Sequence, residues 1–132
     1  MTENKDRPFL LIADDETRIL TAYSRVFVED YNLILVTSGE AALEVIRNFG
    51  VDYALLDNSM NSKLSGLDVL RTKFQDVEND LGDILGYKSN KLKKIVLNSC
   101  TFTPEIIASA TSYGAHCLEK PPALEVLKNY FR

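Results

Sequence analysis

The sequence predicts an α/β domain in which a five-stranded parallel sheet carries helices on both faces. Short apolar runs alternate with longer segments of helical period, which is the pattern of repeated strand–helix–strand units. Two of the runs, 10–13 and 53–56, are apolar at four consecutive positions rather than at alternate ones. Such strands are buried on both faces, as in parallel sheets whose right-handed crossover helices lie on both sides.

Length and composition indicate one domain with one core. The chain has 132 residues, 45% of them hydrophobic, and we expect a single domain over 1–132 with no output domain. The net charge of -4 does not favour nucleic acid as a partner. No run approaches the roughly 18 apolar residues of a membrane span, and no signal peptide is recognisable. We therefore expect a cytoplasmic protein without membrane contact, with Cys100 and Cys117 as reduced thiols in its interior.

The first half of the chain contains two predicted helices. The first is expected over 16–30, and a strand over 32–37 follows it. Ser38 is the predicted N-cap of the second helix, Glu40 lies in its first turn, and Gly50 ends it. Each helix has an apolar face for burial, and these faces comprise Ile19, Leu20, Tyr23 and Phe27 in the first and Ala42, Leu43, Ile46 and Phe49 in the second.

The second half of the chain contains two further helix starts. Thr103 is a predicted N-cap with Pro104 at the first helical position, where the missing proline N–H needs no partner. The last helix is expected after residues 121–122, and its buried residues should be Leu124, Leu127 and Phe131. His116, the only histidine, is expected as a packed residue of a short buried strand rather than as a functional group.

Polar residues follow four of the predicted strands at their carboxyl ends. They are Asp14 and Asp15 after the first run, Asp57 after 53–56, Ser99 after 95–97, and Lys120 after the last strand. In an open parallel sheet these ends share one edge, where ligands bind. We therefore expect three carboxylates, one hydroxyl and one ammonium to converge there.

The predicted cluster suits a divalent cation and a phosphoryl group. At an effective dielectric near 20, carboxylates a few ångströms apart repel by about 4 kcal/mol per pair. A single ammonium does not offset this repulsion, and Mg²⁺ with oxygen ligands would restore the charge balance. The absence of a His or Cys cluster argues against zinc. With the ion bound, an Asp carboxylate can act as a nucleophile toward phosphorus, while Ser99 and Lys120 bind the phosphoryl oxygens.

These strand ends together closely resemble the receiver domain of two-component response regulators. Residues 11–16, LIADDE, look like the acidic pair after strand one of that family, and residues 55–60, LLDNSM, look like its phosphoacceptor segment. Ser99, followed by the small Cys100, matches its Ser or Thr, and Lys120 before a proline matches its lysine. The resemblance covers essentially the whole chain. It implies a CheY-like, flavodoxin-like doubly wound sheet with strand order 2-1-3-4-5.

The resemblance also implies a role for each acidic residue. Asp57 would accept a phosphoryl group from a phosphohistidine of a sensor histidine kinase or a histidine phosphotransfer protein. Asp15, Asp57 and the backbone carbonyl of Ser59 would bind Mg²⁺ directly, and Asp14 would bind it through water.

Ser99 and Lys120 would act with Asp57 and pass on the phosphorylated state. The protein would then be a phosphoacceptor switch with slow self-dephosphorylation, rather than an enzyme that turns over a substrate. Its output would be phosphorylation-controlled binding to a downstream protein.

The chain departs from the usual family pattern at three places. Asn61 stands where the family usually has proline, and the loop from there to Gly66 is longer than usual. Cys117 stands where many members have an aromatic residue that turns inward on activation, so signal output by that rotation is not expected. The segment between Gly66 and Ile95 is also longer than usual, with an insertion around 76–94.

The insertion has two interpretations. Its apolar residues recur at spacings of three and four, as in an extended third helix, and comprise Leu67, Leu70, Phe74, Val77, Leu81 and Ile84. A basic run that contains Lys91, Lys93 and Lys94 follows. Either the stripe packs on its own domain and the lysines are solvated, or the segment forms a surface for a partner or for a homodimer.

Two other functional classes stay open beside the phosphoacceptor switch. A degenerate receiver would no longer take phosphate and would serve as a phosphorylation-independent interaction module. A Mg²⁺-dependent phosphohydrolase would also use an aspartyl nucleophile. That chemistry normally needs a second acid two residues after the nucleophile, and the chain has Ser59 there.

Overall fold

The sheet has the predicted class and strand order. The computed structural model describes residues 6–78 and 92–132. Five parallel strands pair in the order β2-β1-β3-β4-β5. Their bounds are Phe9–Ala13 for β1, Asn32–Val36 for β2, Tyr53–Asp57 for β3, Lys94–Ser99 for β4 and Ala115–Glu119 for β5.

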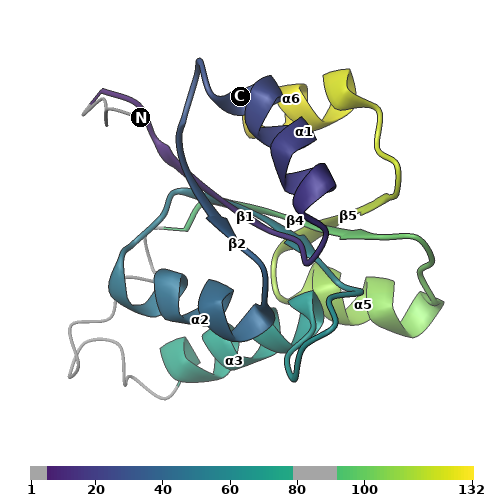
Figure 1. Ribbon diagram of the computed structural model, residues 1–132. Helices are drawn as coiled ribbons and strands as arrows, with labels where there is room; N and C mark the ends of the chain where they lie inside the picture. Colours follow the sequence, from purple (N-terminus) through teal and green to yellow (C-terminus); the bar gives the residue numbers. More distant parts are fainter. Residues whose placement is uncertain (1–5, 79–91) are drawn as a thin grey trace.

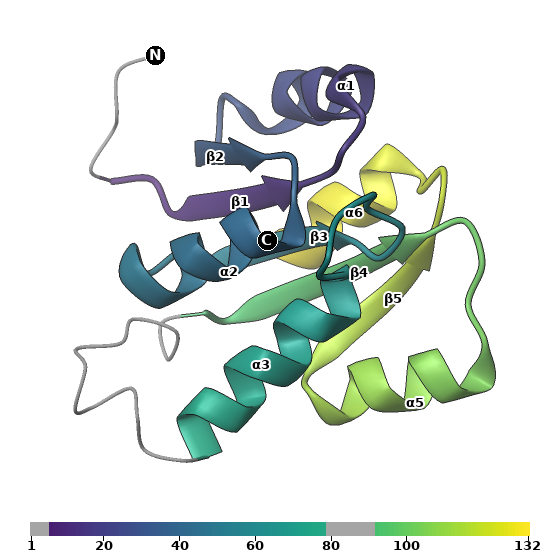
Figure 2. The ribbon, with the colours of Figure 1, turned by 60° about the horizontal axis from the view of Figure 1, so that its bottom comes forward.

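Helices cover both faces of this sheet, as predicted. Helices α1 and α6 lie on one face, and α2, α3 and α5 lie on the other (Figures 1 and 2). Their bounds are Thr17–Phe27 for α1, Gly39–Asn48 for α2, Gly66–Glu78 for α3, Pro104–Ser112 for α5 and Leu124–Phe131 for α6. None of the helices in residues 6–78 and 92–132 has the length and apolar character needed to cross a bilayer.

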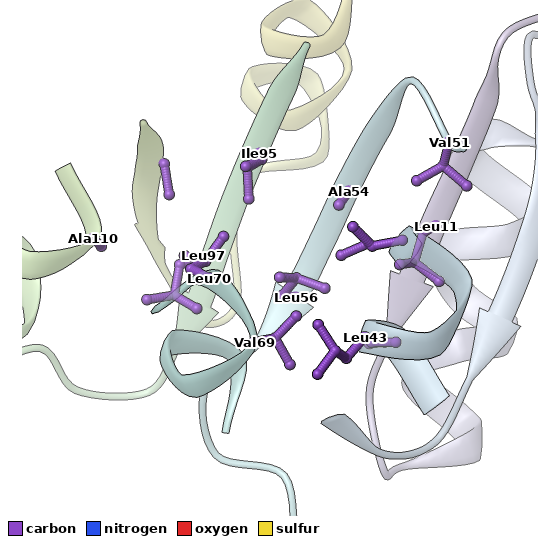
Figure 3. Close-up of a cluster of buried hydrophobic side chains, with 14 of the residues drawn as sticks. Leu11, Leu43, Val51, Ala54, Leu56, Val69, Leu70, Ile95, Leu97 and Ala110 are labelled. Atoms are coloured by element: carbon purple, nitrogen blue, oxygen red, sulfur yellow. The ribbon is translucent and has the colours of Figure 1, made fainter. Parts of the chain in front are cut away.

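The sheet separates two apolar clusters, which explains the continuously apolar strands. Along β1, Leu10 contributes to the cluster under α1 and α6, and Leu11 contributes to the cluster under α2, α3 and α5. Successive side chains of a strand point to opposite faces, and both faces are covered, so the four positions from Leu10 to Ala13 are all buried. Figure 3 shows the second cluster, where Leu97 of β4 lies close to Leu70 of α3.

The predicted ends of α2 and the predicted start of α5 are confirmed, whereas α1 ends at Phe27 rather than at the predicted residue 30. The Ser38 hydroxyl accepts a hydrogen bond from the Ala41 amide at 3.1 Å, and the Thr103 hydroxyl accepts one from the Ile106 amide at 3.2 Å. Each cap satisfies one backbone N–H that has no partner within its helix. Gly50 lies just after α2 with a φ of 78°, a backbone conformation that residues other than glycine rarely adopt.

Two residues predicted to be buried are exposed. Phe49 is 52% exposed and makes an edge contact with Phe9, and Leu124 is 44% exposed. Phe49 follows the last residue of α2, and Leu124 is the first residue of α6, so each lies at a helix end. The predicted burial of Leu127 and Phe131 is confirmed.

His116 and Cys100 were also predicted to be buried, and both are exposed. His116 is exposed because β5 is an edge strand, and its ring stacks on Tyr130 of α6 with centroids 5.0 Å apart. Cys100 is exposed in the loop after β4, whereas Cys117 is half-buried. The predicted extension with Leu81, Ile84 and Lys91 lies outside the described residues.

Candidate functional site

Three carboxylates meet at the carboxyl edge of the sheet. Asp14 and Asp15 follow β1 directly, and Asp57 is the last residue of β3. One carboxylate oxygen of each lies within 4.8 Å of the others. Asp14 and Asp57 are 1% and 3% exposed, and Asp15 is the most exposed of the three. The structure therefore brings together the three acids that the sequence placed at this edge.

Lys120 bridges two of these carboxylates. It follows β5, and its ammonium lies 2.8 Å from Asp14 Oδ2 and 3.2 Å from Asp57 Oδ2. Its backbone N–H donates to the Ser99 carbonyl at 2.8 Å, which holds the start of the loop against β4. The Lys120–Pro121 peptide bond is cis. The lysine therefore reaches the acids of β1 and β3 from the end of the edge strand β5, across the end of β4.

Backbone N–H groups of the following loops hold two of the acids. Asp14 Oδ1 accepts from the Glu16 amide at 2.9 Å, and Asp57 Oδ1 accepts from the Ser59 amide at 2.9 Å. In both carboxylates the second oxygen, Oδ2, faces Lys120. Each side chain is therefore fixed from one side and presents its other oxygen to the centre of the site.

Asp15 is held by a loop contact that the sequence did not indicate. Its Oδ2 accepts from the Asn61 amide at 2.8 Å. A proline at position 61, which the resemblance led us to regard as usual, would have no N–H to donate. This departure from the family pattern therefore supplies an anchor for Asp15.

The two serines predicted at the site lie side by side. Their hydroxyl oxygens are 3.2 Å apart, and Ser99 Oγ donates to the Thr101 carbonyl at 3.0 Å. A hydroxyl has one proton, so Ser59 is the donor in the bond between the two serines. The Ser59 amide meanwhile donates to Asp57. Ser59 therefore connects the Asp57 carboxylate to the hydroxyl of Ser99.

Burial and neighbouring charge act in opposite directions on the ionisable groups. Burial raises the pKa of Asp57, the Ser59 N–H lowers it, the Asp14 charge raises it and Lys120 lowers it, so the pKa lies above its ordinary value. Burial lowers the pKa of Lys120, but its hydrogen bond to Asp14 and the charges of Asp57 and Asp14 outweigh this, so the pKa is raised. The folded protein therefore stabilises the charged form of Lys120, whereas it destabilises the charged form of Asp57 relative to the protonated form.

Gly66 allows close packing behind Asp57. A Cβ at this position would lie 2.6 Å from Leu97 Cδ1 and 2.9 Å from the Asp57 carbonyl oxygen. Side chains larger than hydrogen would push α3 away from the end of β3. The sequence indicated Gly66 only as the end of a loop, and this role depends on a tertiary contact.

The donor set suits a hard divalent cation. Among the described residues, the group that could hold a metal contains only carboxylate oxygens, those of Asp14, Asp15 and Asp57. Three carboxylates and one ammonium leave an excess of negative charge, which a divalent cation with oxygen ligands would balance. The site therefore fits Mg²⁺ and lacks the nitrogen and sulfur ligands that zinc prefers.

Comparison with known proteins finds similar proteins by structure. No model of a protein family matches the chain. No curated protein matches it by sequence. Solved structures do match, and those reported below are receiver domains or a complex that contains one.

A CheY-like receiver domain protein from Methanospirillum hungatei is 20% identical, with a TM-score of 0.75 over 96% of this chain and 91% of that one. A response regulator receiver domain from Bermanella marisrubri is 26% identical, with a TM-score of 0.74 over 96% of each chain. A chain from the complex between the Saccharomyces cerevisiae phosphotransfer protein Ypd1 and the receiver domain of Ssk1 is 18% identical. It has a TM-score of 0.74 over 92% of this chain and 84% of that one. The protein is thus similar to the CheY-like receiver domains of response regulators, and it has their fold.

Proposed function

We propose that residues 1–132 act as one receiver domain that takes a phosphoryl group onto Asp57. The observation that carries the proposal is the position of Lys120, which bridges Asp57 and Asp14 within a group of three carboxylates. A structural ion pair would need one acid and one lysine. The additional carboxylates make the site more negative than its own stability favours, which is typical of a site built for a cation and an anionic ligand.

In the proposed reaction, an oxygen of the Asp57 carboxylate attacks the phosphorus of a phosphohistidine. A P–O bond forms, the P–N bond breaks, and the imidazole nitrogen keeps the electron pair. Lys120 lies against Asp57 Oδ2 and is placed to neutralise a phosphoryl oxygen as the group arrives. Ser99 can turn its hydroxyl from the Thr101 carbonyl toward the same group. Water would later attack the phosphorus of the acyl phosphate, releasing inorganic phosphate and returning Asp57 to its free carboxylate.

Asp14, Asp15, Asp57 and the backbone carbonyl of Ser59 are the residues that would hold Mg²⁺. The bound ion would supply charge neutralisation for the phosphoryl oxygens and for the carboxylates. The protein prepares the ligands itself, because loop amides already fix Asp15 and Asp57.

The proposed donor is a sensor histidine kinase or a histidine phosphotransfer protein, and the proposed compartment is the cytoplasm. One similar structure is a receiver domain in complex with a phosphotransfer protein, which supports this kind of partner. We also propose a downstream protein target for the phosphorylated form. For the insertion around 76–94, packing on its own domain and a surface for a partner or for a homodimer both stay open.

The test is the intact mass of the protein after incubation with Mg²⁺ and acetyl phosphate. A single phosphoryl adduct is expected, and it should be absent in Asp57→Asn and after EDTA treatment. Asp52→Asn is the matched control, because Asp52 is also a buried acid but lies at the other end of β3 and binds the Phe9 amide. It should keep the adduct.

The competing function is a phosphorylation-independent interaction module. No adduct from acetyl phosphate or from a histidine-phosphorylated donor, in a protein that still binds Mg²⁺, would refute the phosphoacceptor proposal and favour this module.

A further inference from the structure

Two polar side chains are buried together beneath the site. Tyr23 of α1 and Asn98 of β4 are 6% and 1% exposed, and the Tyr23 hydroxyl donates to Asn98 Oδ1 at 3.1 Å. Tyr23 belongs to the apolar cluster under α1 and α6, as does Val96, which shares a strand face with Asn98. A leucine at position 98 would continue that apolar face. The core itself therefore does not require a polar pair, whose burial is costly unless it is fully hydrogen-bonded.

Asn98 connects the two strand ends that carry Asp57 and Lys120. Its side-chain Nδ2 donates to the Leu118 carbonyl at 2.9 Å, and its backbone carbonyl accepts from the Asn58 amide at 2.8 Å. Leu118 lies two residues before Lys120, and Asn58 follows Asp57. Asn98 thus holds the ends of β3 and β5 from the strand between them.

The Tyr23 hydroxyl fixes the orientation of the Asn98 amide. Burial raises the pKa of Tyr23 to about 12, the Lys120 charge lowers it and nearby carboxylates raise it, so the hydroxyl keeps its proton and acts as a donor. With Oδ1 toward Tyr23, the amide directs Nδ2 to the Leu118 carbonyl. The reversed amide would place Oδ1 against that carbonyl and lose the bond.

We propose that Tyr23 and Asn98 are positioning residues for Lys120. Their pair fixes the end of β5 relative to β3, and so keeps the ammonium between Asp14 and Asp57. Within the described part of the chain, the side-chain hydrogen bonds of Tyr23 and Asn98 go to each other and to the Leu118 carbonyl, and not to Asp57 or Lys120. The inference rests on the proposed phosphoryl transfer, because positioning matters there for the rate at which Asp57 is phosphorylated.

The first test compares two buried tyrosines. Tyr23→Phe removes the hydroxyl that holds Asn98. Tyr31→Phe is the matched control, because Tyr31 is also buried in this cluster and donates to a carbonyl, that of Phe131, at 3.1 Å. With acetyl phosphate and saturating Mg²⁺, Tyr23→Phe should lower the phosphorylation rate about tenfold, the range typical of groups that orient site residues. Tyr31→Phe should leave the rate close to that of the wild type at a comparable loss of stability.

The second test separates positioning from stability. The double variant Tyr23→Phe/Asn98→Leu replaces both partners by apolar groups of similar size, which should recover stability in urea unfolding. Positioning predicts that the low rate persists, whereas a purely structural role predicts that the rate recovers. In a Lys120→Ala background, Tyr23→Phe should have no further effect on the rate.

Equal rates in Tyr23→Phe and Tyr31→Phe, recovery of the rate in the double variant, or a Tyr23 effect that persists without Lys120 would each overturn the inference. A wild-type protein that takes no phosphoryl group would refute the proposed function instead. The NMR resonance of the Lys120 ammonium then decides on positioning. A shift in Tyr23→Phe and not in Tyr31→Phe supports it, and an unchanged resonance in both overturns it.

Discussion

Removal of the Asp57 charge should make the metal-free protein more stable. Among the described residues, Asp57 lies close to two other carboxylates and to one ammonium, that of Lys120, with its side chain almost fully buried. Asp57→Asn keeps the shape and a carbonyl oxygen that can accept from the Ser59 amide. Lys120 keeps its shorter contact with Asp14. The substitution therefore removes repulsion without leaving a buried cation unpaired.

The expected gain can be worked from the distances. Two carboxylates with oxygens within 4.8 Å repel Asp57 by about 3.5 kcal/mol each at an effective dielectric near 20. The ammonium at 3.2 Å attracts it by about 5 kcal/mol at the same dielectric. The repulsion exceeds the attraction by about 2 kcal/mol, and water around the more exposed Asp15 reduces that difference. We expect Asp57→Asn to raise the free energy of unfolding by about 1–2 kcal/mol.

The gain has a defined pH dependence. The pKa of Asp57 in the folded protein is raised above 3.8, so the folded state binds this proton more tightly than the unfolded state. The wild type therefore loses stability at this group as the pH rises from 3.8 through the folded pKa. The advantage of Asp57→Asn should be absent below that window and complete above it.

The assay is urea unfolding in EDTA across this pH range and at pH 7.5. Asp52→Asn is the control, because this buried acid binds the Phe9 amide away from the carboxylate group, and it should show no gain. Mg²⁺ at a hundred times its Kd should stabilise the wild type by about 2.7 kcal/mol and the variant by less. An Asp57→Asn protein less stable than the wild type at pH 7.5 in EDTA would refute the reasoning, because attraction by Lys120 would then dominate.

Two further predictions concern the packing and the helix caps. Gly66→Ala should destabilise the fold by about 1–3 kcal/mol through contact with Leu97 and the Asp57 carbonyl, and should also slow phosphorylation; unfolding and intact mass measure the two effects. An unchanged unfolding midpoint would show that α3 can shift freely. Ser38→Ala and Thr103→Ala should each lower the free energy of unfolding by about 1 kcal/mol, since each leaves one helix N–H without its cap, and Ser38→Gly should cost less.

The sequence was sufficient for the order and kind of the elements. Continuously apolar strands between amphipathic helices predicted the parallel sheet, and Ser38 and Thr103 predicted two helix starts, all of which the structure shows. These signals are local. An N-cap hydrogen bond joins residues only three positions apart, and a strand that is buried on both faces shows itself as a continuous run of apolar residues.

The same local signals did not predict how deeply residues at helix ends and on an edge strand are buried. Helical period indicates which side of a helix is apolar, but it does not show how far the neighbouring elements extend. Phe49 and Leu124 lie at helix ends beyond that cover, and His116 lies on an edge strand. All three were assigned to the interior from their pattern and are exposed.

The sequence by itself determined which groups reach the carboxyl edge, because all strands of a parallel sheet run in the same direction and their carboxyl ends therefore lie at the same edge. Asp14, Asp57 and Lys120 follow from that rule. The tertiary structure alone decided their partners: the loop amide of Asn61 on Asp15, and the Tyr23–Asn98 pair that ties β3 to β5. Those contacts join residues far apart in the chain, and their geometry depends on how the helices pack, which no local pattern encodes.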